Sequence, residues 1–422
     1  MTSERLSAAL AEIKADESAL VDTLAPLIAL DTSFPPGRGY AAFADHLEGL
    51  LAPLGFACRR VVVPEALWRL PGDGAEVEGE RVNLIAERPS GREPVGLYFH
   101  VDTVPPGDGW SVPPLALTRD GRRLLGRGTA DMKGCIAAVL AALRAAERHQ
   151  LPLRFDPVLL CCTDEEGGLY PGIRYLAEQG ELSGHLLSYN GSAGPRIWAG
   201  CFGSLDLRIR IHGRSAHSGD PVGGINAFEE AVPLLNALIA LKARVEQRTS
   251  AMPPPPHHEG RPLTARLSLT AARGGSKGSA LPHLFEIVVN RRYPPEETAE
   301  AVLAEIRGTV ERALAPGRAL GWNLEVVGHL APVDDPGGPH WPRWQQAVAA
   351  GFGYAPESFR RWGSSTSSDM GWVQQAGIRE ILLGGLGRPE SRGHAADEFT
   401  TLDDLIALAS STLLYLSAEF GT

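Results

Sequence analysis

The N-terminal half of the chain alternates apolar runs of strand length with stretches of helical periodicity. The segment 94–101 is almost continuously apolar, which is typical of a parallel strand covered on both faces. Alternating strands and helices of this kind predict an α/β sandwich with a largely parallel sheet. Helices are predicted at 5–30, 40–54 and 132–148, and strands at 57–63, 82–88, 94–101 and 157–163.

The pattern changes at Ser204, where apolar and charged residues begin to alternate as in a half-exposed strand. The elements predicted from there are a strand, a helix, two strands, a helix and a strand, at 205–211, 226–247, 264–272, 283–291, 296–315 and 322–327. This is the ferredoxin-like order. The α/β pattern then resumes and ends in a helix at 402–419. We therefore expect one α/β domain over 1–203 and 328–422, with a ferredoxin-like domain inserted over 204–327.

Composition narrows the class of protein and its partners. The 422 residues are 44% hydrophobic and 21% charged, as in an ordinary globular protein. A net charge of −10 without any basic run argues against a nucleic-acid partner. No apolar run reaches bilayer-spanning length, and residues 1–20 lack the apolar core of a signal peptide. The five cysteines are odd in number and lie mostly in apolar segments, so we expect reduced thiols in the cytoplasm.

Two acidic residues, Glu165 and Glu166, follow the predicted strand at 157–163. Adjacent side chains leaving a strand point in different directions, so one carboxylate can bind a metal while its neighbour acts as a general base. An isolated acid pair is more often solvated charge. His100 and Asp102 share one side of another strand end, where a carboxylate can fix the tautomer of a metal-bound imidazole.

Asp131 and His394 extend the candidate site. Asp131 lies before a predicted helix, where it suits an N-cap, but the glycines before it also allow close approach to a ligand. A carboxylate can bridge two cations. His394 lies on a glycine-rich loop late in the chain. Two His, a bridging Asp and a Glu at the carboxyl edge of a parallel sheet predict a zinc site, with manganese or cobalt as alternatives.

The chain carries five motifs in order: His100-Val101-Asp102-Thr103-Val104-Pro105, Gly126-Arg127-Gly128 to Gly134, Glu165-Glu166-Gly167, Gly213 to Ser218, and His394 to Glu398. Together they resemble the di-zinc amidohydrolase family of aminoacylase, acetylornithine deacetylase, succinyl-diaminopimelate desuccinylase and glutamate carboxypeptidase. The resemblance runs from the first predicted helix to the last. It implies a catalytic α/β domain with an inserted lid or dimerisation domain.

The resemblance also implies the metal ligands. His100 binds the first metal, Asp131 bridges the two metals, and Glu166 and His394 bind the second. The family places a cis peptide bond after the bridging aspartate, which here is the bond between Asp131 and Met132.

The remaining roles implied by the resemblance belong to the base, its neighbours and the lid. Glu165 is the general base, and Asp102 orients the first histidine ligand. His217 reaches the active site of the partner in a homodimer and binds the developing oxyanion. Arg292 binds the substrate carboxylate, and Ser279 stands where the family usually has Asn.

One ligand position departs from the family pattern. Relatives have an Asp or Glu on the first metal where this chain has Asn190, or Gly191 in the other possible register. An amide oxygen coordinates a cation without contributing charge. The sequence therefore predicts an asymmetric or effectively mononuclear centre, with one or two zinc ions per chain and a weaker first site.

The resulting hypothesis is a metal-dependent hydrolase that cleaves the amide bond of an N-acyl amino acid or a small peptide, with Glu165 as the base. One alternative is an exopeptidase or dipeptidase similar to glutamate carboxypeptidase. The other is a metal-binding or ligand-binding relative without hydrolytic activity, given the missing ligand carboxylate.

Overall fold

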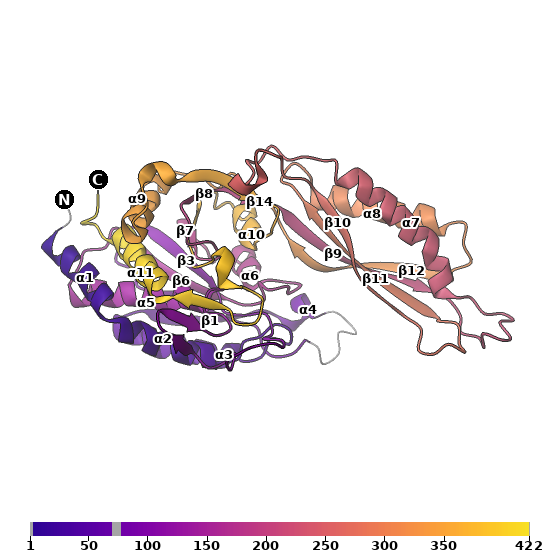
Figure 1. Ribbon diagram of the computed structural model, residues 1–422, viewed down its shortest axis with the longest axis horizontal. Helices are drawn as coiled ribbons and strands as arrows, with labels where there is room; N and C mark the ends of the chain where they lie inside the picture. The colour runs from indigo at the N-terminus through magenta and orange to yellow at the C-terminus, as the bar shows by residue number, and fades with distance from the viewer. Residues whose placement is uncertain (1–2, 70–76, 422) are drawn as a thin grey trace. The chain divides into compact units, whose positions relative to one another are not determined.

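The computed structural model describes residues 3–69 and 77–421, and its contacts divide the chain into two compact units (Figure 1). The first unit comprises the chain up to Trp198 together with Asp335–Arg361 and Trp372–Thr422. The second comprises Ala199–Asp334 and Trp362–Gly371. The second unit therefore extends beyond the predicted 204–327 at both ends, and it includes a later segment that the hydrophobic pattern does not reveal.

A six-stranded mixed sheet forms the centre of the first unit, in the order β1-β2-β6-β3-β7-β15. The neighbours β6, β3, β7 and β15 are parallel, while β2 runs antiparallel to both of its neighbours. His100 pairs with Cys162 and Tyr98 with Ser188, so three parallel strands end at the same edge. The strands are β1 (Ala57–Val62), β2 (Val82–Glu87), β3 (Pro94–His100), β6 (Asp156–Cys162), β7 (His185–Ser188) and β15 (Ile381–Leu383).

The first predicted helix is wrong in one respect, because the structure divides it into α1 (Glu4–Ala15) and α2 (Glu17–Ala29). Asp16 leaves helical geometry, and its side chain accepts a hydrogen bond of 3.0 Å from the Ala19 backbone N–H. A carboxylate used as an N-cap starts a new helix at that point. The other helices that lie wholly or mostly in this unit are α3 (Tyr40–Leu51), α4 (Glu65–Trp68), α5 (Lys133–Arg148), α6 (Gly172–Glu178), α9 (Trp341–Phe352), α10 (Met370–Gln375) and α11 (Leu402–Leu416).

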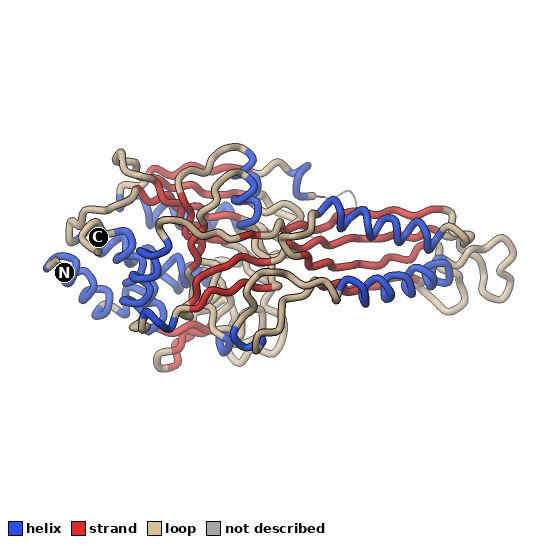
Figure 2. The backbone as a smooth tube through the Cα atoms, turned by 90° about the horizontal axis from the view of Figure 1, so that it is seen from above, coloured by secondary structure: helices blue, strands red, loops and turns tan. Residues whose placement is uncertain are grey.

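Helices α5 and α11 lie side by side and supply much of the apolar core of this unit (Figures 1 and 2). Ile136, Val139 and Leu140 of α5 are fully buried, as are Leu405 and Ala409 of α11. Burying a Leu, Ile or Val side chain contributes about 1.5–3 kcal/mol each. This packing fixes α5, and with it the loop that carries Asp131.

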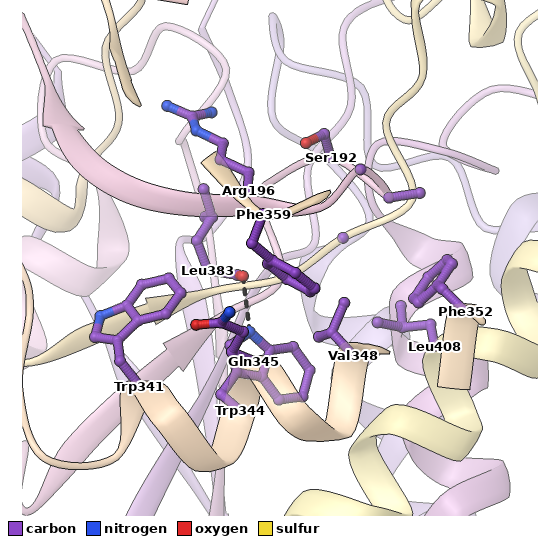
Figure 3. Close-up of a pocket in the computed structure, with 14 residues that line it drawn as sticks. Ser192, Arg196, Trp341, Trp344, Gln345, Val348, Phe352, Phe359, Leu383 and Leu408 are labelled. Atoms are coloured by element: carbon purple, nitrogen blue, oxygen red, sulfur yellow. Dashed lines mark hydrogen bonds between the residues drawn. The ribbon is translucent and has the colours of Figure 1, made fainter. Parts of the chain in front are cut away.

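Helix α9 is held against the end of β15 by its tryptophans (Figure 3). The indole N–H of Trp344 donates a 2.9 Å hydrogen bond to the Leu383 carbonyl, and that of Trp341 donates to the Pro336 carbonyl at 3.2 Å. Both tryptophans line a small pocket with Val348 and Leu383. The start of α9 is therefore fixed relative to the sheet.

The second unit contains a four-stranded antiparallel sheet in the order β10-β11-β9-β12, with α7 and α8 on one face (Figure 1). The apolar positions of β9 face these helices, while Arg210 forms ion pairs with Glu286 and Glu325. The predicted ferredoxin-like order is confirmed. The elements are β9 (Gly203–His212), α7 (Ala227–Val245), β10 (Arg266–Gly274), β11 (Leu284–Tyr293), α8 (Ala299–Leu314) and β12 (Gly321–Leu330).

Two small three-stranded sheets complete the fold, in the orders β13-β8-β14 and β16-β5-β4. No helix within residues 3–69 and 77–421 has the length and hydropathy of a bilayer-crossing segment. The strands are β4 (Thr118–Asp120), β5 (Arg123–Leu125), β8 (Arg196–Cys201), β13 (Val333–Asp334), β14 (Arg360–Ser364) and β16 (Phe399–Thr401).

Candidate active site

Four of the predicted metal ligands meet at the carboxyl edge of the large sheet. His100 ends β3, Glu166 follows β6, Asp131 precedes α5, and His394 lies on the loop before β16. Ligand atoms of His100, Asp131 and Glu166 all lie within 4.8 Å of one another. The His394 Nε2 atom lies 3.1 Å from Glu166 Oε2 and completes the cluster.

Asp131 lies between the two imidazoles. Its Oδ1 is 3.1 Å from Nε2 of His100, and its Oδ2 is 3.2 Å from Nε2 of His394. Burial raises the pKa of Asp131, but the hydrogen bonds with His100 and His394 outweigh burial and lower it below its ordinary value. One oxygen thus faces each histidine, which is the arrangement a bridging carboxylate requires. The bond between Asp131 and Met132 is cis, as the resemblance implies.

Buried oxygen atoms without hydrogen-bond partners show that this cluster fits a cation. Oε1 of Glu166 and Oδ1 of Asp102 are both buried and lack such a partner. Burial raises the pKa of Glu166, and hydrogen bonds with Asp131 and Glu166 raise the pKa of His394 to about 10. The shift of His394 reflects the negative charge of these two carboxylates. Two imidazoles with two carboxylates form a mixed donor set suited to zinc and similar divalent ions.

Asp102 links two strand ends. The Nδ1 atom of His100 lies 3.0 Å from the Asp102 backbone carbonyl and 3.8 Å from its carboxylate Oδ1. The hydrogen bond that sets the tautomer is therefore to the backbone, whereas the sequence pattern suggested the carboxylate. The other carboxylate oxygen accepts a 2.9 Å hydrogen bond from the Glu166 backbone N–H. Asp102 thus holds the acid pair beside β3.

Glu165 and Asn190 contact each other directly. The side-chain amide of Asn190 donates a 2.9 Å hydrogen bond to Oε1 of Glu165. Asn190 follows β7, the strand next to β3, so it lies at the same edge of the sheet as the ligands. Its amide nitrogen is engaged with the predicted base, a contact that the sequence did not suggest.

His217, Ser279 and Arg292, the residues predicted to act in a lid, belong to the second unit. The loops of His217 and Ser279 are paired, because the Ser218 backbone N–H donates to the Ser279 carbonyl at 3.0 Å. Arg292 lies on β11 and donates a 2.7 Å hydrogen bond to the Ser367 hydroxyl. The first two residues are therefore neighbours, and Arg292 is oriented by the late segment that joins this unit.

Glu398 anchors the bridging loop, and sequence reasoning gave it no role. It is buried, its Oε1 accepts hydrogen bonds from the backbone N–H groups of Ala130 (2.9 Å) and Asp131 (3.1 Å), and its Oε2 pairs with Arg127 at 2.6 Å. Burial and the nearby Asp131 raise its pKa. Arg127 and Glu398 both belong to the five sequence motifs. No pattern in the sequence, however, predicts that these two residues pair with each other.

Asp164 supports the acid pair in a similar way. Its side chain is buried, accepts a 2.8 Å hydrogen bond from the Arg81 guanidinium and accepts another from the Tyr40 hydroxyl at 2.9 Å. Burial raises the pKa of Asp164 to about 6. Asp164 adopts a positive φ of 61°, which turns the chain sharply before Glu165.

Comparison with known proteins places this fold and site in a family. The model of Peptidase family M20/M25/M40 matches residues 96–417, and the chain belongs to this family. It is therefore a metal-dependent amidohydrolase.

Two curated relatives carry enzyme names. A succinyl-diaminopimelate desuccinylase of Acidiphilium cryptum is 31% identical over 340 residues, which cover 78% of this chain and 84% of that protein. An acetylornithine deacetylase of Erwinia tasmaniensis is 30% identical over 254 residues, covering 60% and 63% respectively.

Solved structures share the fold. A di-peptidase from Saccharomyces cerevisiae superposes with a TM-score of 0.77 at 15% identity and covers 98% of both chains. An M20 family metallo-carboxypeptidase from Sulfolobus solfataricus has a TM-score of 0.73 at 17% identity, covering 94% of this chain and 98% of its own.

Replacing Glu398 by Gln should weaken metal binding about 10- to 100-fold, because residues that orient a ligand typically contribute that much. The substitution leaves the buried Arg127 charge unpaired and loosens the backbone of Asp131. Competition with a chromogenic chelator measures the affinity. Glu390→Gln, at an exposed position of the same loop, is the control. Equal chelator sensitivity of Glu398→Gln and wild type would contradict this role.

Proposed function

We propose that this protein is a zinc-dependent deacylase that hydrolyses the amide bond of an N-acyl amino acid. The arrangement of Asp131 carries the proposal, because each of its oxygens faces one imidazole, at 3.1 and 3.2 Å. Glu165 lies beside this cluster, next to the ligand Glu166. The names of the two curated relatives, a desuccinylase and a deacetylase, support this substrate class.

The residues of the candidate site have separate roles in the proposed reaction. His100, Asp131, Glu166 and His394 would hold the metal, which would lower the pKa of water and polarise the substrate carbonyl. Glu165 accepts a proton from the attacking water and donates it to the leaving amine. The hydrogen bond from Asn190 at 2.9 Å fixes the orientation of the Glu165 carboxylate for both transfers.

Two lid residues complete the proposal. Arg292 would bind the carboxylate of the amino acid product, since a planar guanidinium suits a bidentate partner. His217 would donate a hydrogen bond to the developing oxyanion in the partner subunit of a homodimer. Ser279, in the loop paired with that of His217, would contact the substrate.

Activity of the purified protein against a substrate panel tests the function. The panel contains N-acetyl, N-succinyl and N-formyl amino acids and dipeptides, each with added zinc, manganese or cobalt. We expect turnover of an N-acyl amino acid, and a loss of kcat of about 10²- to 10⁴-fold in Glu165→Gln with its metal content unchanged. Turnover of dipeptides alone would make the enzyme a dipeptidase. No turnover of any substrate would favour a ligand-binding relative, and an active Glu165→Gln would exclude that residue as the base.

The centre is proposed to hold one metal tightly and the other weakly. Asn190 supplies no charge where relatives have a carboxylate, and its amide nitrogen is engaged with Glu165. The ligands Asp131, Glu166 and His394 would therefore hold the tighter ion.

Replacing Asn190 by Asp should create a second tight site. After dialysis against a weak chelator, we expect one zinc ion per catalytic centre in wild type and two in the variant, because the new carboxylate adds charge beside His100. Elemental analysis measures the change. Ser192→Asp, which adds the same charge two residues further along, should match wild type. Two tightly held ions in the wild-type centre would refute the asymmetry.

We propose a homodimer whose interface lies on the second unit, because this unit exposes apolar side chains. Phe228, Val232 and Ile239 recur at helical spacing along α7 and are 48%, 43% and 58% exposed. Leu269 on the edge strand β10 is also exposed. Exposed apolar stripes of this kind mark association surfaces.

Replacing Ile239 by Glu should convert the dimer to a monomer, because a charge at the centre of an apolar interface is left unpaired. Light scattering coupled to size exclusion measures the mass, and activity should fall with dimer content. Leu320→Glu changes an equally exposed apolar residue away from the stripe and should leave the dimer intact. A dimeric Ile239→Glu, or a monomeric wild type, would contradict this interface.

A cytoplasmic location is proposed from the cysteines. None of the five, all of which lie among the described residues, forms a disulfide bond, and Cys135, Cys161, Cys162 and Cys201 are buried. Thiols of this kind are typical of a reducing compartment.

A further inference from the structure

A buried arginine, Arg81, lies beside the turn that carries the acid pair. Arg81 immediately precedes β2, which runs antiparallel to β6 with Leu84 opposite Cys161. Continued by three residues, this register places Arg81 opposite Asp164, the residue before Glu165. The Nε atom of Arg81 donates a 2.8 Å hydrogen bond to Oδ2 of Asp164, and neither side chain is more than 1% exposed. A fully buried ion pair therefore adjoins the proposed base along the chain.

Aromatic rings and backbone carbonyls enclose the guanidinium of Arg81. Its Cζ atom lies 3.8 Å from the centroid of the Trp68 ring, and 5.5 and 5.8 Å from those of Phe34 and Tyr40. Its Nη1 atom donates a 2.9 Å hydrogen bond to the Gly79 carbonyl. Cation–π contacts and hydrogen bonds are stronger where water is excluded. Arg81 is therefore held in one position, and a lysine could not make all of these contacts at once.

The segment 32–40 joins this network to the end of β3. The Thr32 hydroxyl donates a 2.6 Å hydrogen bond to the Val101 carbonyl. At the other end of the segment, the Tyr40 hydroxyl donates to Oδ1 of Asp164 at 2.9 Å. The segment therefore ties the end of β3 to the turn that follows β6.

Asp164 depends on this support because of its backbone conformation. Its φ of 61° lies in the left-handed region, which is unfavourable for residues other than glycine. Both oxygens of its side chain are engaged, Oδ1 by Tyr40 and Oδ2 by Arg81. A conformation of this kind persists only where the surrounding structure holds it. The turn that directs Glu165 therefore depends on Arg81 and Tyr40.

The orientation of Glu165 is sensitive to that turn. Its Oε1 accepts a 2.9 Å hydrogen bond from the Asn190 amide, and the backbone N–H of Glu166 donates to Asp102 at 2.9 Å. Both bonds run from the turn to the ends of other strands, so a shift of the turn lengthens them. A misplacement of about 1 Å at a catalytic group can reduce the rate about 100-fold.

We propose that Arg81 and Tyr40 are positioning residues for hydrolysis, which act on Glu165 through Asp164. This inference rests on the proposed function, in which Glu165 is the base. Because the two residues act on the turn and not on the substrate, their loss lowers kcat and leaves KM unchanged.

The variants Tyr40→Phe and Arg81→Lys test this role. Tyr40→Phe deletes one hydroxyl, and Arg81→Lys keeps the charge but loses the planar fork. With zinc at saturation, we expect kcat for the best substrate of the panel to fall about 10- to 100-fold in each variant, with KM unchanged. The control, Tyr415→Phe, removes an equally buried hydroxyl that is hydrogen-bonded to His185 at the start of β7. It should keep the kcat of wild type even where its melting temperature falls as far.

Hydrogen exchange provides a second measurement that requires no substrate. The backbone N–H groups of residues 166–168 are all hydrogen-bonded. Mass spectrometry should show faster exchange of these amides in Tyr40→Phe and Arg81→Lys than in wild type and Tyr415→Phe. Unchanged exchange, or a kcat equal to that of Tyr415→Phe, would overturn the positioning role. If no substrate of the panel is turned over, the proposed function fails, while the exchange rates still decide whether Arg81 and Tyr40 hold the turn.

Discussion

The concentration of carboxylates in a buried space is the constraint on which the first unit depends. Asp102, Glu166 and Glu398 are almost fully buried, and Asp131 lies among them. Neighbouring negative charges repel each other strongly where water is excluded. Backbone N–H groups and Arg127 offset the charge of Glu398, and the Glu166 N–H offsets part of that of Asp102. The imidazoles stabilise part of the remaining negative charge, and a divalent cation bound at this edge would stabilise it further.

The sequence predicted those parts of the fold that local patterns determine. The apolar run of β3, the helical periodicity of α5 and the alternation of β9 each specify an element, and glycine-bounded motifs at strand ends specify an edge of the sheet. Two predictions differ from the structure, namely the single first helix and the segments assigned to the second unit, and each difference has a local cause. Asp16 ends one helix and begins the next, and the segment 362–371 joins the second unit through contacts that carry no periodic signal.

Contacts between side chains that are far apart in the sequence could not be predicted from the sequence. The hydrogen bond between Asn190 and Glu165 and the ion pair of Arg127 with Glu398 connect residues that share no motif spacing. Arg81 has no pattern around it either, because a single arginine before a predicted strand is more often a solvated charge. Only the pairing of β2 with β6 brings it to Asp164, and only the fold of the segment 32–40 adds Tyr40.

The discontinuity of the first unit has a consequence during protein synthesis. His100 leaves the ribosome well before His394, and at about 5–20 residues per second the roughly 300 residues between them take about 15–60 s to synthesise. During that interval Asp131 and Glu166 have no His394 and no Glu398 to complete their surroundings. Most of the second unit is contiguous and can fold meanwhile. Until the loop of His394 has been synthesised, a nascent chain therefore lacks one side of the candidate site.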